Sequence, residues 1–301
     1  MLAKKLTNVL LLVALAATAS VVTPTATAHA QEIQITGPLA GAPAVRRMRQ
    51  YRTGRVQLIV PTVGYTLQDE FARHLMTGLE ANIHFTDFLG IGVWGAVANF
   101  ANAFQINTDL TGQIISNGQT TARNQLAMPD NEGFGDQVAR LVGLASVHAI
   151  FAPLRGKLAL FQGAFVDTDF YVLAGFTAAF VEERADFTGA EAAACANANA
   201  TQRPTACGPS QSARTTRFAP APMFGIGLNL YFNDFLGLAL QWRAFPFDMN
   251  PAGDDFAGNT SAASVSQPDG EIDGSDQRFY FHHMMNIGLI INLPPEAAVS
   301  E

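Results

Sequence analysis

Two stretches of this sequence repeat one pattern: Gly78–Trp94 reads GLEANIHFTDFLGIGVW, and Gly225–Gln241 reads GIGLNLYFNDFLGLALQ. Each holds Phe-(Thr/Asn)-Asp-Phe-Leu-Gly between two segments in which apolar residues occupy every second position. Successive side chains of a β-strand point to opposite faces, so this alternation predicts strands with one apolar face and one small or polar face. Asp preceded by Thr or Asn favours a tight turn. Each copy is therefore predicted to be a β-hairpin.

The N-terminus has the features of a secretory signal peptide. Two lysines precede an apolar run, and Ala28-His29-Ala30 provides a small-residue cleavage motif. We predict cleavage between Ala30 and Gln31, so that residues 1–30 take no part in the fold. Residues 31–53 are interrupted by Pro and Gly and then become basic, which favours a periplasmic leader.

Composition limits the class of protein. Charged residues make up 14% of the chain, against about 25% in ordinary soluble domains, and the mean hydropathy is +0.15. After the predicted signal peptide, no apolar run approaches the ~20 residues of a membrane helix. An exported, apolar chain without spanning helices indicates a closed β-barrel, which also satisfies every backbone polar group in lipid. The net charge of −7 argues against nucleic acid as a partner.

Alternating segments along the whole chain predict eight strands joined by unequal connections. Three connections on one side are short turns, whereas the other side has three long, polar connections and one short one, as in bacterial outer-membrane barrels. We therefore predict an all-β fold: an antiparallel, up-and-down transmembrane β-barrel of about eight strands over residues 54–293, followed by a tail at 294–301. Whether the segment 101–143 has structure of its own stays open. The predicted strands are residues 55–65, 75–85, 89–97, 144–161, 166–180, 218–232, 236–245 and 279–293.

The two faces of the strands indicate which side meets lipid. One parity is almost continuously apolar and rich in Phe, while the other mixes Gly, Ala, Asn, Gln, Tyr and single charges. The mixed set suits a small packed lumen better than a solvated exterior, which would carry more Lys and Glu. The last strand also has the polar-x-Gly-x-x-Φ-x-Φ spacing (Φ, apolar) of terminal strands recognised by the barrel-assembly machinery. Its four positions are Asn286, Gly288, Ile291 and Leu293.

Three short segments carry a family resemblance: Gly54-Arg55-Val-Gln-Leu, Gly64-Tyr65-Thr-Leu-Gln-Asp and Phe85-Thr-Asp-Phe-Leu89. Together with their surroundings, they resemble the outer-membrane β-barrel domain family abundant in myxobacteria and related δ-proteobacteria, over roughly residues 45–293. The resemblance implies an outer-membrane barrel without a settled biochemical activity. Some similar proteins belong to envelope and gliding-motility assemblies. The long Ala/Asn/Cys segment departs from the family, so partner specificity is expected there.

The histidines suggest a catalytic interpretation, because some outer-membrane barrels are hydrolases that use His with a carboxylate and Ser. His84 and Glu80 share lumen parity but lie toward the short-turn end, away from external substrates. His282 is predicted to face inward without an identifiable partner, and the alternation places His148 and His283 on the outward face. Asp269-Gly-Glu271-Ile-Asp273-Gly274 resembles the start of a calcium loop but lacks the Glu required at its twelfth position. We therefore predict no catalytic site, no metal site and no cofactor.

Two residue pairs are predicted to be linked. Cys195 and Cys207 are an even pair in an exported loop, which favours a disulfide over a metal site. If the fourth and fifth strands turn about Gly163, Lys157 lies opposite Asp169, and both residues have lumen parity. We therefore predict an opposite-charge pair inside the barrel.

Three functions fit a barrel of this size. Eight strands leave a lumen that side chains can fill. This favours a structural or interaction role in the cell envelope over a small channel for ions or solutes, and an outer-membrane lipid hydrolase or protease is the third alternative. The expected location is the outer membrane. The expected partners are outer-membrane lipid, the barrel-assembly machinery and envelope proteins that meet the long extracellular loops or the periplasmic face.

Overall fold

A computed structural model of the chain describes residues 52–67, 69–98, 105–117, 134–160, 164–184, 214–255, 257 and 271–295, with a few single positions between 190 and 202. The predicted cleavage site at Ala30 and Gln31 and the predicted disulfide of Cys195 and Cys207 lie outside these residues and stay predictions. Among the residues described, no helix combines the length and the hydropathy needed to span a bilayer.

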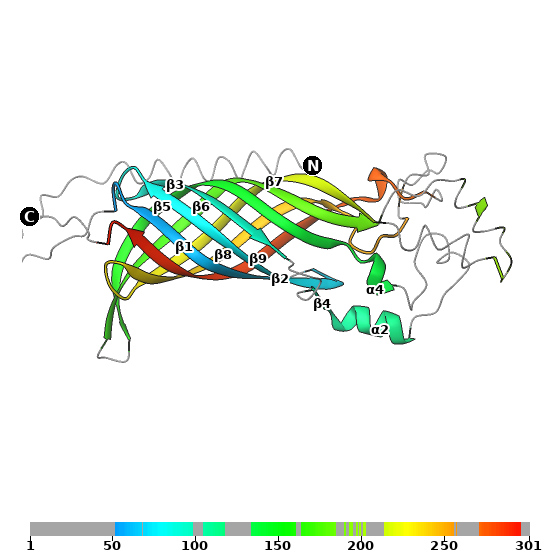
Figure 1. Cartoon of the computed structure of the whole chain (residues 1–301), viewed down its shortest axis with the longest axis horizontal. Coiled ribbons are helices and arrows are strands. Elements are labelled where there is room, and N and C mark those ends of the chain that lie inside the picture. The colour runs from blue at the N-terminus through cyan, green and yellow to red at the C-terminus, as the bar shows by residue number, and fades with distance from the viewer. Residues whose placement is uncertain are drawn as a thin grey trace, which may run out of the picture. The chain divides into compact units, whose positions relative to one another are not determined.

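Eight long strands form one closed antiparallel barrel (Figure 1). Neighbours pair in the order β1–β9–β8–β7–β6–β5–β3–β2, and β1 pairs with β2 to close the ring. Each strand therefore has hydrogen-bonded neighbours on both sides, as lipid requires. The predicted eight-stranded barrel is confirmed. The strands are β1 (Val56–Thr66), β2 (Ala72–His84), β3 (Leu89–Val97), β5 (Arg140–Leu160), β6 (Ala164–Arg184), β7 (Arg214–Tyr231), β8 (Leu236–Met249) and β9 (Arg278–Leu293).

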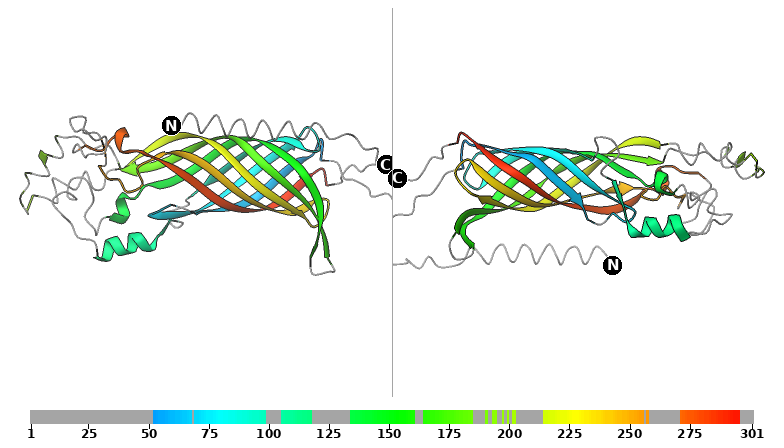
Figure 2. Two further views of the ribbon diagram at one scale, coloured as in Figure 1. Left: turned by 180° about the vertical axis from the view of Figure 1, so that it is seen from behind. Right: turned by 60° about the horizontal axis from the view of Figure 1, so that its bottom comes forward.

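The long connections carry structure of their own. Between β3 and β5, the three-residue strand β4 (Gln105–Asn107) pairs with the first residues of β2. Two helices follow it, α2 (Asp109–Asn117) and α4 (Phe134–Gln137), and a short 3-10 helix, η1 (Gly274–Asp276), precedes β9. All of them gather at one end of the barrel, here called the long-loop end; the opposite end is the short-turn end (Figures 1 and 2).

The two sequence repeats form the hairpins β2–β3 and β7–β8, and their turns are built alike. The Thr86 N–H donates to the Leu89 carbonyl at 3.2 Å, and the Leu89 N–H donates back to Thr86 Oγ1 at 3.0 Å. Asn233 and Leu236 repeat both hydrogen bonds, at 3.3 and 2.7 Å. The residue before the shared Asp therefore closes each turn, which explains why the sequence places Thr or Asn there.

Three bulges interrupt the regular alternation of faces, one of them near the start of β5, between Leu141 and Gly143. In β1 the register shifts between Ile59 and Thr62, and in β5 it shifts between Phe151 and Leu154, with one extra residue each time. Pro61 and Pro153 lie in the last two of these bulges. Proline cannot donate to a ladder, so within sheets it is found at such irregular positions.

The bulges overturn two predicted orientations, because an extra residue inverts the parity of everything beyond it. Between the two bulges of β5, the inward-facing residues have even numbers, whereas beyond the second bulge they have odd numbers, as at Arg155. The predicted orientation of His148 assumed the parity of Arg155 for the whole strand. His148 was predicted to face outward, but it lies inside the barrel and is 1% exposed. Thr62 has the parity of Val56, Leu58 and Val60 in the sequence, which predicts that it faces outward with them, but it points inward and is 2% exposed.

The register of the β5–β6 hairpin shows that the predicted Lys157–Asp169 pair was wrong. Lys157 lies opposite Asp167, and Arg155 lies opposite Asp169. The prediction placed the turn about Gly163, one residue later than the centre defined by the observed pairing. The observed register therefore places a basic residue opposite an acidic one twice, at Arg155–Asp169 and Lys157–Asp167. The predicted register would have produced one such pair, Lys157–Asp169.

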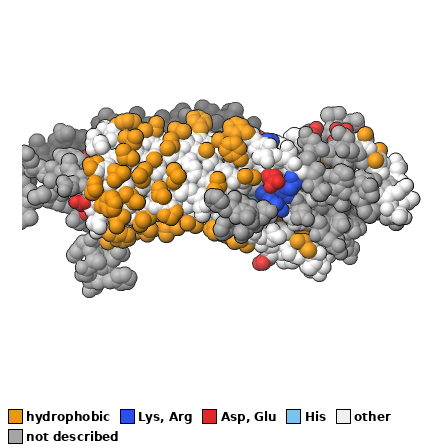
Figure 3. All heavy atoms as spheres, viewed as in Figure 1, with side chains coloured by type: hydrophobic (Ala, Val, Ile, Leu, Met, Phe, Trp, Pro, Cys, Tyr) orange, Lys and Arg blue, Asp and Glu red, His pale blue; other side chains and the backbone are white. Residues whose placement is uncertain are grey.

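The outer wall of the barrel is apolar (Figure 3). On β3, for example, the outward side chains of Leu89, Ile91, Val93 and Val97 are 42–50% exposed. Among the described strand residues that face outward, Asp, Glu, Lys and Arg occur only near the long-loop end, as at Arg73. Charge is therefore kept out of the central band of the wall.

The height of this band fits a bilayer. Phe218 and Phe232, near the two ends of β7, are 56% and 62% exposed. Fourteen residue steps of about 3.3 Å on a strand tilted by about 40° place them about 35 Å apart along the barrel axis. A hydrocarbon core of about 30 Å fits between such aromatic rims.

Candidate functional site

A buried ion pair occupies the centre of the lumen. Glu80 of β2 and Arg243 of β8 are both 0% exposed, and Arg243 Nη2 lies 2.6 Å from Glu80 Oε2. Gln241 Nε2 donates to the same oxygen at 2.9 Å, and Asn82 Nδ2 donates to Glu80 Oε1 at 2.9 Å. His148 Nε2 lies 3.3 Å from Glu80 Oε1. This dense set of partners is the condition under which a buried ion pair is tolerated.

Aromatic side chains complete this layer of the lumen. The Arg243 guanidinium lies 4.5 Å from the ring centre of Trp94 on β3, and Tyr171 Oη on β6 accepts a hydrogen bond from Gln241 at 2.8 Å. Trp94 and Tyr171 are buried, as are the ion pair and its hydrogen-bond partners. Side chains from β2, β3, β5, β6 and β8 thus fill the barrel at this level, as expected for eight strands.

Arg52, which precedes β1, closes the short-turn end of the lumen. Its Nε donates to Asp169 Oδ2 at 3.1 Å, and its guanidinium lies 3.9 Å from the ring centre of Tyr231. Arg155 Nε lies 3.6 Å from the other oxygen of Asp169. The backbone N–H of Arg52 donates to Asp87 in the β2–β3 turn at 3.0 Å. Asp169, which the sequence analysis paired with Lys157, therefore contacts two arginines, Arg52 and Arg155.

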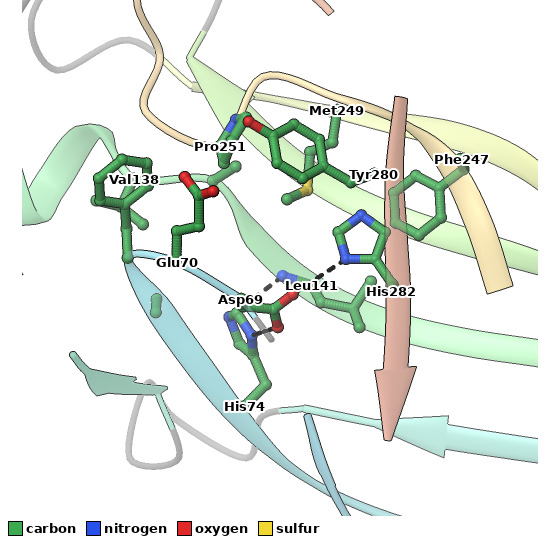
Figure 4. Close-up of a pocket in the computed structure, with 13 residues that line it drawn as sticks. Asp69, Glu70, His74, Val138, Leu141, Phe247, Met249, Pro251, Tyr280 and His282 are labelled. Carbon is green, nitrogen blue, oxygen red and sulfur yellow. Dashed lines mark hydrogen bonds and ion pairs between the residues drawn. The ribbon is translucent and has the colours of Figure 1, made fainter. Parts of the chain in front are cut away.

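At the long-loop end, one carboxylate contacts two histidines (Figure 4). Asp69 lies between β1 and β2, with Oδ1 3.0 Å from His282 Nδ1 and Oδ2 3.6 Å from His74 Nδ1. Burial raises the pKa of Asp69, but the contacts with His282 and His74 outweigh it and bring the pKa below its usual range. Asp69 is therefore ionised and only accepts hydrogen bonds. The inference that His282 had no partner was wrong.

These contacts assign the tautomers of both histidines. The Leu141 N–H donates to His74 Nε2 at 3.3 Å, so neutral His74 carries its proton on Nδ1, toward Asp69. Because an ionised Asp69 can only accept, neutral His282 also carries its proton on Nδ1. His282 Nε2 is then a lone-pair acceptor, buried and without a hydrogen-bond partner among the described residues.

A small cavity of about 20 Å³ adjoins His282 (Figure 4). Apolar side chains such as Leu141, Phe247 and Met249 form much of its wall, and Glu70 and Tyr280 also line it. Within the described part of the chain, the lining contains no Ser, Thr or Cys.

The remaining sequence-predicted residues have simpler surroundings. Asn286 and Gly288 face the lumen, and β9 ends at Leu293, which is 41% exposed on the outer wall. A role for this strand in assembly stays a prediction. Asp273, from the calcium-like segment, caps η1 and accepts the Ser275 N–H at 2.7 Å.

Sequence reasoning missed three residues of these networks: Asp69, Arg52 and Arg243. Asp69 and Arg52 lie outside the predicted strands, so strand parity could not assign them to the lumen. Arg243 was placed on the lumen face, and Glu80 was the single acidic residue of lumen parity in the second strand. The isolated opposite charges of Glu80 and Arg243, each on a lumen face, were the one signal that could have suggested a pair.

Comparison with known proteins assigns the chain to no family. No family model matches it, and no curated protein is significantly similar in sequence. Among solved structures, the N-terminal β-barrel domain of Pseudomonas aeruginosa OprF is 9% identical, with a TM-score of 0.38 over 81% of this chain and 100% of that one. The outer membrane protein OprG from Pseudomonas aeruginosa is 9% identical, with a TM-score of 0.37 over 81% and 98%. Ail, the attachment invasion locus protein of Yersinia pestis, is 9% identical, with a TM-score of 0.33 over 80% and 99%.

Proposed function

We propose that this chain is an integral barrel of the outer membrane with a structural or interaction role in the cell envelope. One observation carries the proposal: the barrel places apolar side chains outside and an ion-paired, hydrogen-bonded network inside. Water-soluble proteins rarely expose a continuous apolar surface of this extent. A band about 35 Å high between aromatic rims is suited to a bilayer.

The filled lumen supports an interaction role over a channel. Glu80, Arg243 and their neighbours occupy the centre, and Arg52 occupies the short-turn end, so conduction would require both layers to rearrange. The long-loop end, by contrast, carries β4, α2 and η1. We infer that partners meet this end of the protein.

An enzymatic role is the weaker alternative. The most enzyme-like group, Asp69 with His74 and His282, pairs bases with an orienting carboxylate, but among the described residues no Ser, Thr or Cys lines the adjoining cavity. Lipid and peptide turnover by the purified protein tests this point. Turnover that survives His282→Asn would show that this cluster is not responsible.

Fractionation and electrophoresis test the location. We expect the protein in outer membranes and, in detergent, β-type circular dichroism with migration that changes on heating. Recovery as a soluble periplasmic protein would overturn the proposal. In liposomes we expect no solute flux above that of protein-free vesicles; sustained flux through the folded barrel would favour the channel.

Labelling tests the orientation. Short turns mark the periplasmic side of bacterial barrels, so tags inserted near Asn197 and Gly258 should be labelled on intact cells. Labelling that requires permeabilised outer membranes would reverse the orientation.

A further inference from the structure

We propose that the long-loop mouth binds a primary ammonium group, presented as the lysine side chain of a partner protein. The ammonium head would enter the cavity beside His282 and Glu70. This inference rests on the proposed function, in which the long-loop end meets partners.

The polar groups of the cavity define the chemistry of the ligand. In the neutral imidazole with its Nδ1 proton directed at Asp69, His282 Nε2 is an acceptor, and it lies in a side chain that is 6% exposed. Figure 4 shows this nitrogen on the side of the ring away from Asp69, toward Tyr280 and Met249. Glu70 adds a carboxylate to the lining. The complement of two such acceptors is a positively charged group with several N–H donors.

The size of the cavity favours ammonium over guanidinium. About 20 Å³ holds one group the size of a water molecule. A lysine ammonium is a compact point charge with three donors, whereas the planar arginine fork is wider. Aromatic faces also stabilise a cation, and Phe247 and Tyr280 line the same space.

An adjoining groove provides a path for the rest of the ligand. It has a volume of about 510 Å³ and shares Asp69 and Glu70 with the cavity. Its wall includes Ile106 and Leu110, which are 50% and 46% exposed and can pack against the methylene stem of a lysine. Asp109 and Arg73, of opposite charge, also line the groove.

The groove wall is fixed in place by hydrogen bonds to the backbone of the β1–β2 connection. Thr108 Oγ1 donates to the Glu70 carbonyl at 2.6 Å, and Thr111 Oγ1 donates to the Phe71 carbonyl at 2.6 Å. These bonds hold the start of α2 against the segment that carries Asp69 and Glu70. The site is therefore formed before a ligand arrives, which reduces the entropy lost on binding.

The test uses the purified full-length barrel in detergent micelles. The probe is N-acetyl-lysine N-methylamide, and its uncharged Nε-acetyl derivative is the matched control. Binding is followed by the ¹⁵N shift of His282 Nε2 and by calorimetry. We expect a saturable shift of this nitrogen with the charged probe. Glu70→Gln should weaken binding about fivefold to tenfold, while Glu271→Gln, an equal charge change at another exposed position of the same end, should change it less than about twofold.

Three results would overturn the site. They are no shift of His282 Nε2, equal binding of the acetylated probe, and equal losses in the two Glu variants, which would indicate general attraction to an acidic surface. Migration that changes on heating confirms that each variant is folded. Failure of the proposed location would appear in cell fractionation instead, and binding to the purified protein would still decide whether the site exists.

Discussion

Replacing Arg243 with Met should destabilise the barrel more than replacing Arg243 and Glu80 together. Both side chains are 0% exposed, so removing one leaves the other as an uncompensated buried charge. Such a loss typically costs about 3–5 kcal/mol of unfolding free energy. In Arg243→Met, Glu80 keeps its contacts with Gln241, Asn82 and His148. We therefore expect the lower part of this range, about 3 kcal/mol.

The double variant Glu80→Leu/Arg243→Met removes both charges. Its remaining cost is that Gln241 and Asn82 lose an acceptor, about 1–3 kcal/mol in a buried layer. The two single variants should together lose about 6–8 kcal/mol. A double-mutant cycle should therefore give a coupling energy of several kcal/mol, which is large for one pair.

Equilibrium urea unfolding in phospholipid vesicles measures these free energies, with β-type circular dichroism as the readout. Arg278→Met is the matched control, because its partner Asp254 lies 3.5 Å away and both side chains are 36% and 23% exposed. We expect this control to lose less than about 1 kcal/mol. If the two lumen substitutions are additive, Glu80 and Arg243 do not interact in the folded protein and the register that brings them together is wrong.

The remaining predictions concern the mouth, the turns and the loop. Asp69→Asn should lower the unfolding free energy at pH 7, because the pKa of Asp69 is lower in the folded state than in the unfolded state. The stability that the ionised Asp69 contributes is present above the unfolded pKa of about 3.9 and is lost as the pH falls toward the folded-state pKa. Urea titrations from pH 7 to pH 3 should show wild type and variant converging, and a constant difference would argue against the charge of Asp69. Thr86→Ala and Asn233→Ala each remove a turn hydrogen bond, so each should cost about 0.5–1.5 kcal/mol in the same assay; no effect at either position would mean that the repeat does not stabilise its turns. Mass spectrometry of protein from an oxidising envelope should find Cys195 bonded to Cys207, and two free thiols would contradict the predicted disulfide.

The sequence alone determined the fold because a lipid-facing strand leaves a direct record in the chain. Its side chains alternate between two environments of opposite polarity, so the period of two is visible without any contact being known. The third strand, residues 89–97, was predicted with the bounds that it has. The repeated turns were equally local, since Thr86 and Asn233 bond to residues three positions along the chain.

The tertiary structure decided what depends on registers and on contacts across the lumen. One extra residue at Pro153 places His148 on the face opposite to the predicted one. The β5–β6 turn is centred one residue earlier than predicted, which places Asp169 opposite Arg155. Neither shift changes the hydrophobic pattern enough to be read from it. Glu80 meets Arg243, and Asp69 meets His282, only because the sheet closes and brings distant strands around one small lumen. The local pattern of the sequence shows that a strand has one apolar and one mixed face, whereas bulges, register and closure of the barrel decide which side chains meet in the lumen.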